Sequence, residues 1–455
     1  MEKRDIFAAN EDSRLPQTNW NAVTIAEIAE KVGMGPFGSS IKVETFVPNG
    51  VPIISGQHLH GSRLDDSQGY NFITEVHARH LANANVQKGD VILTHAGNIG
   101  QVAYIPDRSQ YNKYVISQRQ FYLRCDQSKV IPEYVTAYFN SPEGRHKLLA
   151  NASQVGVPAI AQPVSYLRTI DIPLPSLNEQ RAIAHILGTL DDKIELNQRM
   201  NETLESMAYA IFKDWFIDFG LVRAKMERRL TEFPREITEL FPDSLDHSGM
   251  PVGWSKVPLK KIGSIVTGKT PSTRKPNYFG NSMPFLKIPD MRKRIYVLRT
   301  SVGLSDEGVY TQANKTVPAG SISVSCIATP GLVVLNHRAT QTNQQINTVV
   351  PSDLKQSHFV FWSCRQLANL VKIGGVGGSV FQNMNKKTFE NLEFVYPGKK
   401  IARIFSRHVS KLHERILAGE HEIDTLTQLR QTLLPKLISG EIRVTDAESG
   451  SGLSS

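Results

Sequence analysis

Apolar or small residues recur at alternating intervals of four and three along two long stretches of the chain, one from Ile183 and one from Phe405. This heptad spacing is typical of helices that pair in a coiled coil, and it predicts two long helices packed antiparallel. The alternative is two separate amphipathic helices, each packed on its own domain. The apolar seam positions are Ile183, Leu187, Leu190, Ile194, Leu204 and Ile211 in the first stretch, and Phe405, Val409, Leu412, Ile416, Ile423, Leu426 and Leu433 in the second.

The segments ahead of the two helices resemble each other. Trp20–Ile28 and Trp254–Ile262 share an apolar pattern at an offset of 234, and Ser117–Arg119 corresponds to Asn343–Gln345 at an offset of 226. Between them, short apolar runs bounded by polar turns indicate paired strands. Drifting offsets are what loop insertions produce between two copies of one fold, so we expect a duplicated domain.

The combined pattern predicts an α+β protein in which two mixed α/β domains form a pseudo-twofold repeat, separated by two long helices that pair as an antiparallel coiled coil. We expect the first mixed domain over residues 1–175 and the first long helix with a connector over 176–250. The second mixed domain is expected over residues 251–397, and the second long helix with a disordered tail over 398–455. A length of 455 residues accommodates this division.

The net charge of +9 is unevenly distributed. Residues 1–175 carry no net charge, 176–250 carry −5, 251–397 carry +12 and 398–455 carry +2. A basic domain is compatible with nucleic acid as a partner, although a basic solvated surface explains it equally well. The charge therefore permits DNA binding without establishing it.

The chain shows no apolar run long enough to span a membrane and no signal-peptide pattern, so we expect no membrane contact. Cys125, Cys326 and Cys364 are far apart and odd in number, which argues against a disulfide framework or a metal site. A reducing, cytoplasmic location is the corresponding expectation.

No convincing catalytic motif is present. Gly263–Thr270 fits the pattern of a phosphate-binding loop, but the prolines and β-branched residues around it oppose the helix that such a loop requires. The thirteen histidines form no His-Glu-x-x-His motif, and no amino-methyltransferase loop of the Asn-Pro-Pro-aromatic or Asp-Pro-Pro-Tyr type occurs. A nucleotide hydrolase is thus a poorly supported third alternative, and we predict neither catalytic nor metal-binding residues.

Several phrases resemble the specificity subunit of type I restriction–modification systems. The most specific is Ile172–Arg181, which reads Ile-Pro-Leu-Pro-Ser-Leu-Asn-Glu-Gln-Arg and precedes the first long helix. The second helix departs from the pattern, with Lys399–Arg403 in place of Glu-Gln-Arg. The other similar phrases are Leu187–Ile194, Leu221–Glu227, Val266–Ser272 and Leu433–Ile442.

The resemblance implies a non-catalytic subunit that binds double-stranded DNA. Each target-recognition domain would read one half of a bipartite target, and the paired helices would set the gap between the halves. The partners it implies are two methyltransferase (modification) subunits and the motor–nuclease (restriction) subunits. No cofactor is expected in this chain, because S-adenosylmethionine would bind the partner methyltransferase subunits. A coiled-coil interaction scaffold without sequence-specific DNA binding is the competing interpretation.

Base edges are read by Arg, Lys, Asn and Gln, and phosphates by Lys, Arg, Ser and Thr. Loop residues of these types are the candidate DNA contacts. In the first domain they are Ser39, Ser40, Lys42, Gln57, His58, Thr94, His95, Asn98, Gln118 and Arg119. In the second domain they are Lys269, Thr270, Ser272, Lys287, Arg292, Lys293, Arg294, Asn343, Gln344 and Gln345.

Overall fold

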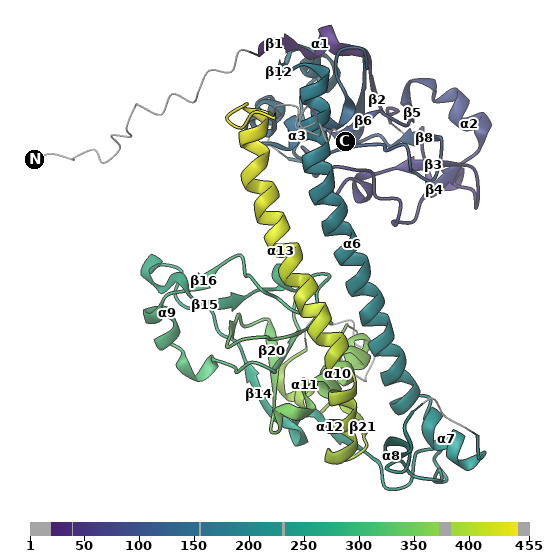
Figure 1. The fold of residues 1–455 in the computed structure, drawn as a ribbon, viewed down its shortest axis with the longest axis vertical. Coiled ribbons are helices and arrows are strands. Elements are labelled where there is room, and N and C mark those ends of the chain that lie inside the picture. The colour runs from purple at the N-terminus through teal and green to yellow at the C-terminus, as the bar shows by residue number, and fades with distance from the viewer. Residues whose placement is uncertain (1–19, 39, 154–155, 230–232, 373–383, 445–455) are drawn as a thin grey trace, which may run out of the picture. The chain divides into compact units, whose positions relative to one another are not determined.

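The computed structural model describes residues 20–38, 40–153, 156–229, 233–372 and 384–444. Contacts divide the chain into two compact units. Unit 1 comprises Met1–Asp192 together with Leu426–Ser455, and unit 2 comprises Lys193–Thr425. Each unit contains one mixed α/β domain and a portion of each long helix (Figure 1).

Unit 1 is built on two four-stranded sheets. The main sheet is antiparallel and has the order β2 (Ala29–Met34), β9 (Gln120–Cys125), β6 (Val91–Thr94) and β7 (Val102–Tyr104). The second has the order β4 (Asn71–Ile73), β3 (Val51–Ile54), β8 (Lys113–Ile116) and β5 (Asn85–Gln87), with β3 and β8 parallel.

The side chains of β9 point alternately into the two hydrophobic cores of unit 1. Phe121, Leu123 and Cys125 belong to one hydrophobic cluster, whereas Tyr122 belongs to the other. This is the period of two expected of a strand that is buried on both faces. The main sheet therefore lies between the two cores.

Short elements complete unit 1. Helices α3 (Pro132–Asn140), α4 (Pro142–Leu149) and α5 (Pro163–Thr169) each begin at a proline, which suits the first helical turn because its amide is unpaired there. The remaining elements are α1 (Ile25–Ile28), α2 (Glu75–His80), the pair β1 (Asn21–Thr24) with β12 (Asp171–Leu174), and the pair β10 (Ala152–Ser153) with β11 (Ala159–Ile160).

Unit 2 repeats this architecture. Its main sheet has the order β14 (Gly263–Thr267), β20 (Ile346–Pro351), β17 (Ile322–Ser325) and β18 (Val333–Leu335). A second sheet contains β16 (Gly303–Leu304), β15 (Phe279–Leu286) and β19 (Gln341–Thr342), and β13 (Ser255–Pro258) pairs with β21 (Glu393–Tyr396). The helices of its domain and connector are α7 (Gly220–Met226), α8 (Arg235–Thr238), α9 (Asp306–Tyr310), α10 (Ser357–Lys372) and α11 (Lys386–Glu390).

The strand register confirms the predicted duplication. In unit 1, Ile54 pairs with Ile116 across a parallel junction, and in unit 2 Leu286 pairs with Thr342 in the same way. The main sheets share one strand order, and each is followed by a helix, α3 or α10, that packs on it. The two domains are therefore copies of one fold.

The long helices are α6 (Leu177–Phe216), α12 (Lys399–His408) and α13 (Ser410–Ile438). In unit 1, Glu179 pairs with Arg443 and Asp191 with Arg430, so the two chain segments run antiparallel. In unit 2, the two helices are in close contact at Gly419 of α13, because a Cβ added there would meet the side chain of Asn201 of α6.

Every predicted seam position is buried or half-buried. The second helix is not continuous as predicted, because it is interrupted at Val409. Within the described residues, none of the helices is long and apolar enough to cross a membrane.

Candidate DNA-binding surfaces and their attachment to the helices

Four loops of unit 1 meet at one end of the main sheet. Gly35 donates its amide to Gln120 O (2.9 Å), and His95 donates to Arg119 O (2.9 Å). A third bond joins the amide of Gly97 to Pro158 O (2.9 Å). Backbone bonds thus hold the turns after β2 and β6, the turn before β9 and the segment before β11 together. We call this the unit 1 loop cluster.

The exposed side chains of the unit 1 loop cluster include Asn98, Gln118 and Arg119. None of them has a side-chain hydrogen bond or ion pair within the described part of the chain. The neighbouring His95 uses Nε2 to contact Gln118 O (3.1 Å), and burial lowers the pKa of His95. His95 is therefore neutral at pH 7 and supplies no charge for a phosphate.

Other first-domain candidates face inward. His58 is 1% exposed, accepts the Ser55 amide at Nδ1 (3.0 Å) and stacks on Tyr70 with ring centroids 4.3 Å apart. Thr94 is also buried and donates to Gln101 Oε1 (3.3 Å). Neither side chain can reach a base in this conformation. Both therefore stabilise the loops from inside and are not presented to DNA.

Gln101 was missed by the sequence reasoning. Its Nε2 donates to Gly56 O (2.9 Å) and Leu59 O (3.2 Å), which ties the loop after β3 to the loop cluster. The candidate Gln57 on that tied loop is exposed, but its amide donates to Gly69 O (3.0 Å). No sequence signal marked this role of Gln101, because it depends on contacts with carbonyls that lie more than 40 residues away in the chain.

The remaining first-domain candidates lie just beyond β2. Ser40 is exposed and donates Oγ to Phe37 O (2.8 Å), while its own carbonyl contacts His77 Nε2 (2.9 Å). Lys42 is exposed. Ser39 lies outside the described residues.

Unit 2 has an equivalent loop cluster. Gly268 donates its amide to Ile346 O (3.1 Å), as Gly35 does at the start of β9. Gln344 is exposed, and its Oε1 accepts the hydroxyl of Thr270 (2.5 Å). Asn343 is instead buried and bonded to Gln345, whose Oε1 accepts Asn343 Nδ2 (3.0 Å). Asn343 therefore shapes the turn that presents Gln344.

The basic candidates of the second domain separate into two groups. Lys269, Arg292 and Lys293 are exposed. Arg294 instead forms an ion pair with Glu420 of α13 (3.7 Å), so part of its charge is used within unit 2. Two further candidates complete the set. Ser272 is exposed, and Lys287 Nζ lies 5.8 Å from the centroid of the Phe285 ring.

The nucleotide-loop pattern at Gly263–Thr270 forms no phosphate-binding loop. Gly263–Thr267 is strand β14, and no helix begins at Lys269 or Thr270. Within the part of the chain that the structure describes, no group of three or more His, Cys, Asp or Glu side chains is placed to hold a metal ion.

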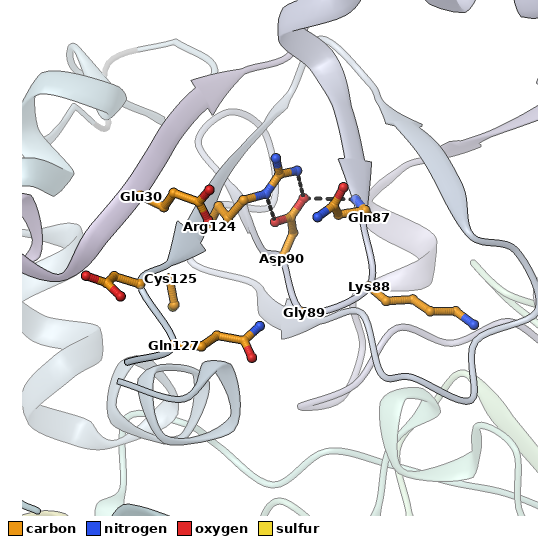
Figure 2. A pocket seen from close by; sticks show the side chains of 9 residues that line it. Glu30, Gln87, Lys88, Gly89, Asp90, Arg124, Cys125 and Gln127 are labelled. Carbon is orange, nitrogen blue, oxygen red and sulfur yellow. Dashed lines mark hydrogen bonds and ion pairs between the residues drawn. The ribbon is translucent and has the colours of Figure 1, made fainter. Parts of the chain in front are cut away.

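A polar cavity of about 220 Å³ lies at the opposite end of the unit 1 main sheet (Figure 2). Its centre is Asp90, which accepts both Nε and Nη2 of Arg124 at 2.7 Å, and this contact raises the pKa of Arg124. Burial raises the pKa of Cys125, which also lines the cavity, to about 12, so its thiol is not an activated nucleophile. The Asp90–Arg124 contact therefore stabilises the end of the main sheet that lies opposite the unit 1 loop cluster.

Gln180, from the Glu-Gln-Arg phrase, attaches the start of α6 to unit 1. It is fully buried, and its Oε1 accepts the amide of Ile131 (3.0 Å). Its Nε2 donates to Lys129 O (3.0 Å) and Pro175 O (2.9 Å). In unit 2 a different contact serves the start of α12, where Arg403 donates to Asp353 (2.5 Å).

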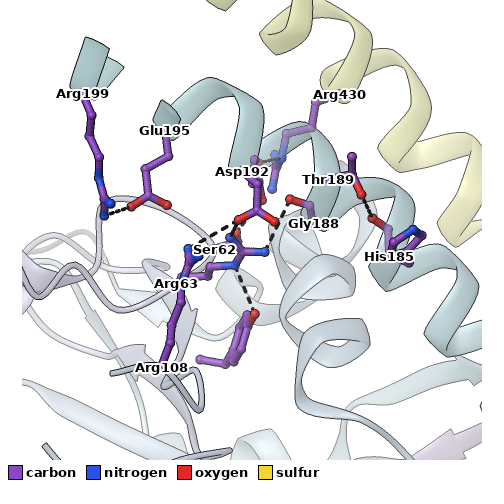
Figure 3. Close-up of polar contacts among 12 residues, drawn as sticks. Ser62, Arg63, Arg108, His185, Gly188, Thr189, Asp192, Glu195, Arg199 and Arg430 are labelled. Atoms are coloured by element: carbon purple, nitrogen blue, oxygen red, sulfur yellow. Dashed lines mark hydrogen bonds and ion pairs between the residues drawn. The ribbon is translucent and has the colours of Figure 1, made fainter. Parts of the chain in front are cut away.

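A charged cluster attaches the first domain to both long helices (Figure 3). Arg63 pairs with Asp192 and also contacts Gly188 O, while Ser62 donates to Asp191 Oδ2 (2.6 Å). Asp191 Oδ1 in turn forms an ion pair with Arg430 Nε of α13 (2.6 Å). The ordinary loop residues Ser62 and Arg63 carried no sequence signal for this role.

The equivalent attachment in unit 2 is neutral and buried. Tyr296 occupies the position of Arg63, since each forms a parallel bridge to the end of an equivalent strand. His413 of α13 contacts Tyr296 Oη at Nδ1 and Trp362 Nε1 at Nε2, both at 3.1 Å. An indole N–H can only donate, so Nε2 is unprotonated and Nδ1–H donates to the tyrosine. His358 stacks on His413 with ring centroids 4.1 Å apart.

The fold and sites define a protein with two copies of one mixed domain, each presenting a polar loop cluster and each attached to long helices. Residues 17–206 and 251–419 match the family model described as type I restriction modification DNA specificity domain. The chain therefore belongs to this family, whose members recognise bipartite DNA targets. Its two matched domains correspond to the two half-site domains.

Known proteins of this family are similar over most of the chain. The HindI specificity subunit of Haemophilus influenzae is 32% identical and aligns with 79% of this chain and 88% of its own. The MjaIX specificity subunit of Methanocaldococcus jannaschii is 25% identical over 97% of both chains. The crystal structure of an S subunit from M. genitalium shares the fold, with a TM-score of 0.54, 16% identity and coverage of 94% of this chain and 98% of that one.

Proposed function

We propose that the two loop clusters read the two half-sites of this chain's bipartite DNA target, one domain for each half. The observation that carries the proposal is that equivalent turns at the start of β9 and β20 present exposed glutamines, Gln118 and Gln344, on two copies of one fold. A glutamine amide matches the donor–acceptor pattern of adenine in the major groove. The neighbouring residues differ between the copies, so the half-sites differ too.

The chain performs no catalysis in this proposal. It supplies target recognition to two methyltransferase subunits, which bind S-adenosylmethionine and the flipped base, and to motor–nuclease subunits that cleave DNA. The complex works on DNA in the cytoplasm. The family membership supports this assignment of roles, and no catalytic group is required of this chain.

We further propose that methyltransferase subunits dock on the long helices. Leu196, Met207 and Tyr209 of α6 lie outside the heptad seam and are 61%, 49% and 40% exposed. Tyr209 also lines a groove of about 790 Å³ between α6 and α10, together with Trp362 and Arg365. Exposed apolar side chains on a helix, one of them lining a groove, favour a protein partner over solvent.

Methylation-aware sequencing of DNA modified by the complete methyltransferase complex tests the reading of half-sites. Gln118→Ala should relax base preference in one half of the methylated motif, and Gln344→Ala in the other half. Gln127→Ala is the matched control, because Gln127 is exposed at the opposite end of β9. If both variants keep the full motif, the loop clusters do not read the bases. Methylation without any motif would instead favour the scaffold interpretation.

A further inference from the structure

Exposed apolar side chains are grouped around the unit 1 loop cluster. Phe37 is 75% exposed, Val157 is 67% exposed and Val43 is 81% exposed. Single exposed apolar residues are ordinary on protein surfaces. Here, however, Phe37 follows the Gly35 turn, and Val157 precedes the carbonyl of Pro158 that accepts Gly97. Both therefore adjoin the turn that presents Gln118.

The backbone around Phe37 is constrained on both sides. At Gly35 a Cβ would lie 2.0 Å from Ser117 O, so only glycine allows this close approach to the turn before β9. Gly38 has φ of +62°, a left-handed conformation that favours glycine. The carbonyl of Phe37 accepts Ser40 Oγ (2.8 Å). These contacts constrain the backbone that carries the exposed aromatic ring before any ligand arrives, which lowers the entropic cost of binding.

The position has a polar counterpart in unit 2. Gly35 and Gly268 make the same backbone bond to the start of β9 and β20, so Phe37 corresponds to Thr270. Thr270 is engaged with Gln344. The two loop clusters therefore differ in chemistry at this point: one has an apolar ring, and the other has a hydroxyl–amide pair.

Charge adds a second reason for an apolar contact. Residues 1–175 have no net charge, whereas 251–397 carry +12. A domain that contacts few phosphates releases few counterions on DNA, so other contacts must supply more of its binding energy. An aromatic ring can pack on a thymine methyl group or wedge between base pairs, and both contacts are independent of salt.

We propose that Phe37 is a specificity-determining residue of the first domain that makes an apolar contact with a base of its half-site. The inference rests on the proposed reading of DNA by the loop clusters. Its sequence consequence is a thymine preference, or a preference for a flexible base step, at one position of that half-site.

The test measures DNA binding by the complete methyltransferase complex with Phe37→Ala and Phe37→Leu. We expect Phe37→Ala to weaken binding roughly tenfold, in line with the loss of one base–aromatic contact, with Phe37→Leu in between. The slope of log affinity against log salt should stay unchanged. Tyr310→Ala is the matched control, because Tyr310 is an 84% exposed aromatic of unit 2 and should leave first half-site reading intact.

Modified DNA identifies the contact. Replacing the half-site thymines singly by uracil removes the methyl group, and 2-aminopurine reports unstacking by its fluorescence. Wild-type complex should respond at one position by one of these readouts, and Phe37→Ala should abolish the response. Equal affinity, motif and responses for wild type and Phe37→Ala overturn the inference. If Gln118→Ala and Phe37→Ala are both silent while wild type binds its target, the proposed loop reading itself is wrong.

Discussion

Replacing His413 by glutamine should remove a pH-dependent contribution to the stability of unit 2. His413 is buried, and both of its ring nitrogens are bonded, to Tyr296 and to Trp362. A glutamine amide retains one donor and one acceptor, and it does not titrate. The substitution therefore changes the response to pH more than it changes packing. His358, which stacks on His413, is retained in the variant.

The magnitude follows from the shift of the pKa. Burial lowers the pKa of His413 from 6.5 to about 2. Because the unfolded chain then binds a proton that the folded chain does not, the stability is complete above pH 6.5 and is lost as the pH falls toward about 2. The loss is about 1.4 kcal/mol per pH unit, so acidification by two units below the unfolded pKa costs about 2 to 3 kcal/mol.

Urea unfolding followed by tryptophan fluorescence measures this difference, because Trp362 and Trp215 lie in the same hydrophobic cluster of unit 2. The free energy of unfolding should fall more steeply with acidification in the wild type than in His413→Gln. Carboxylates elsewhere titrate in both proteins and cancel in the comparison. Parallel pH dependences for the two proteins would refute the argument that His413 is held neutral by its burial and partners.

Three further variants test the DNA-binding surfaces and the helix pair. Arg292→Ala should weaken binding to all sequences and reduce the salt slope by about 1, as expected for one phosphate contact, and a titration across salt concentrations that shows an unchanged slope excludes that contact. Gly268→Ala places a Cβ 2.2 Å from Asn343 O and should displace the unit 2 turn, so methylation-aware sequencing should show relaxation confined to the second half-site. Leu190→Asp combined with Ile194→Asp introduces charge into the seam and should prevent assembly, and an intact complex on size exclusion would contradict the role of the helix pair.

Much of the architecture could be predicted because it depends on local periodicity. The heptad spacing predicted the two long helices, and every predicted seam position is buried or half-buried. The interruption at Val409 was not predicted, since an apolar residue at a seam position gives no local sign of a break. The duplicated turns at Ser117–Arg119 and Asn343–Gln345 were found because a turn keeps its residue types when loops around it change in length.

The sites were harder to predict. His58, Thr94 and Asn343 have the same residue types as exposed readers of DNA, and only their surroundings distinguish them. His58 stacks on Tyr70, and it lies on the loop whose Gly56 carbonyl accepts Gln101 from a distant segment. Arg294 was predicted as a DNA contact, and its ion pair with a distant helix could not be read from neighbouring residues.

The sequence by itself determined the duplication, the heptad seams and the concentration of positive charge in the second domain, because spacing, turn preference and charge are properties of local segments. Tertiary structure alone decided which polar side chains face outward and how each domain is attached to the helices. The attachment is charged in unit 1, between Arg63 and Asp192, and neutral in unit 2, between Tyr296 and His413. Tyr296 and His413 lie 117 residues apart, and only folding places one ring nitrogen against one hydroxyl in a buried site where an unpaired polar group would be destabilising.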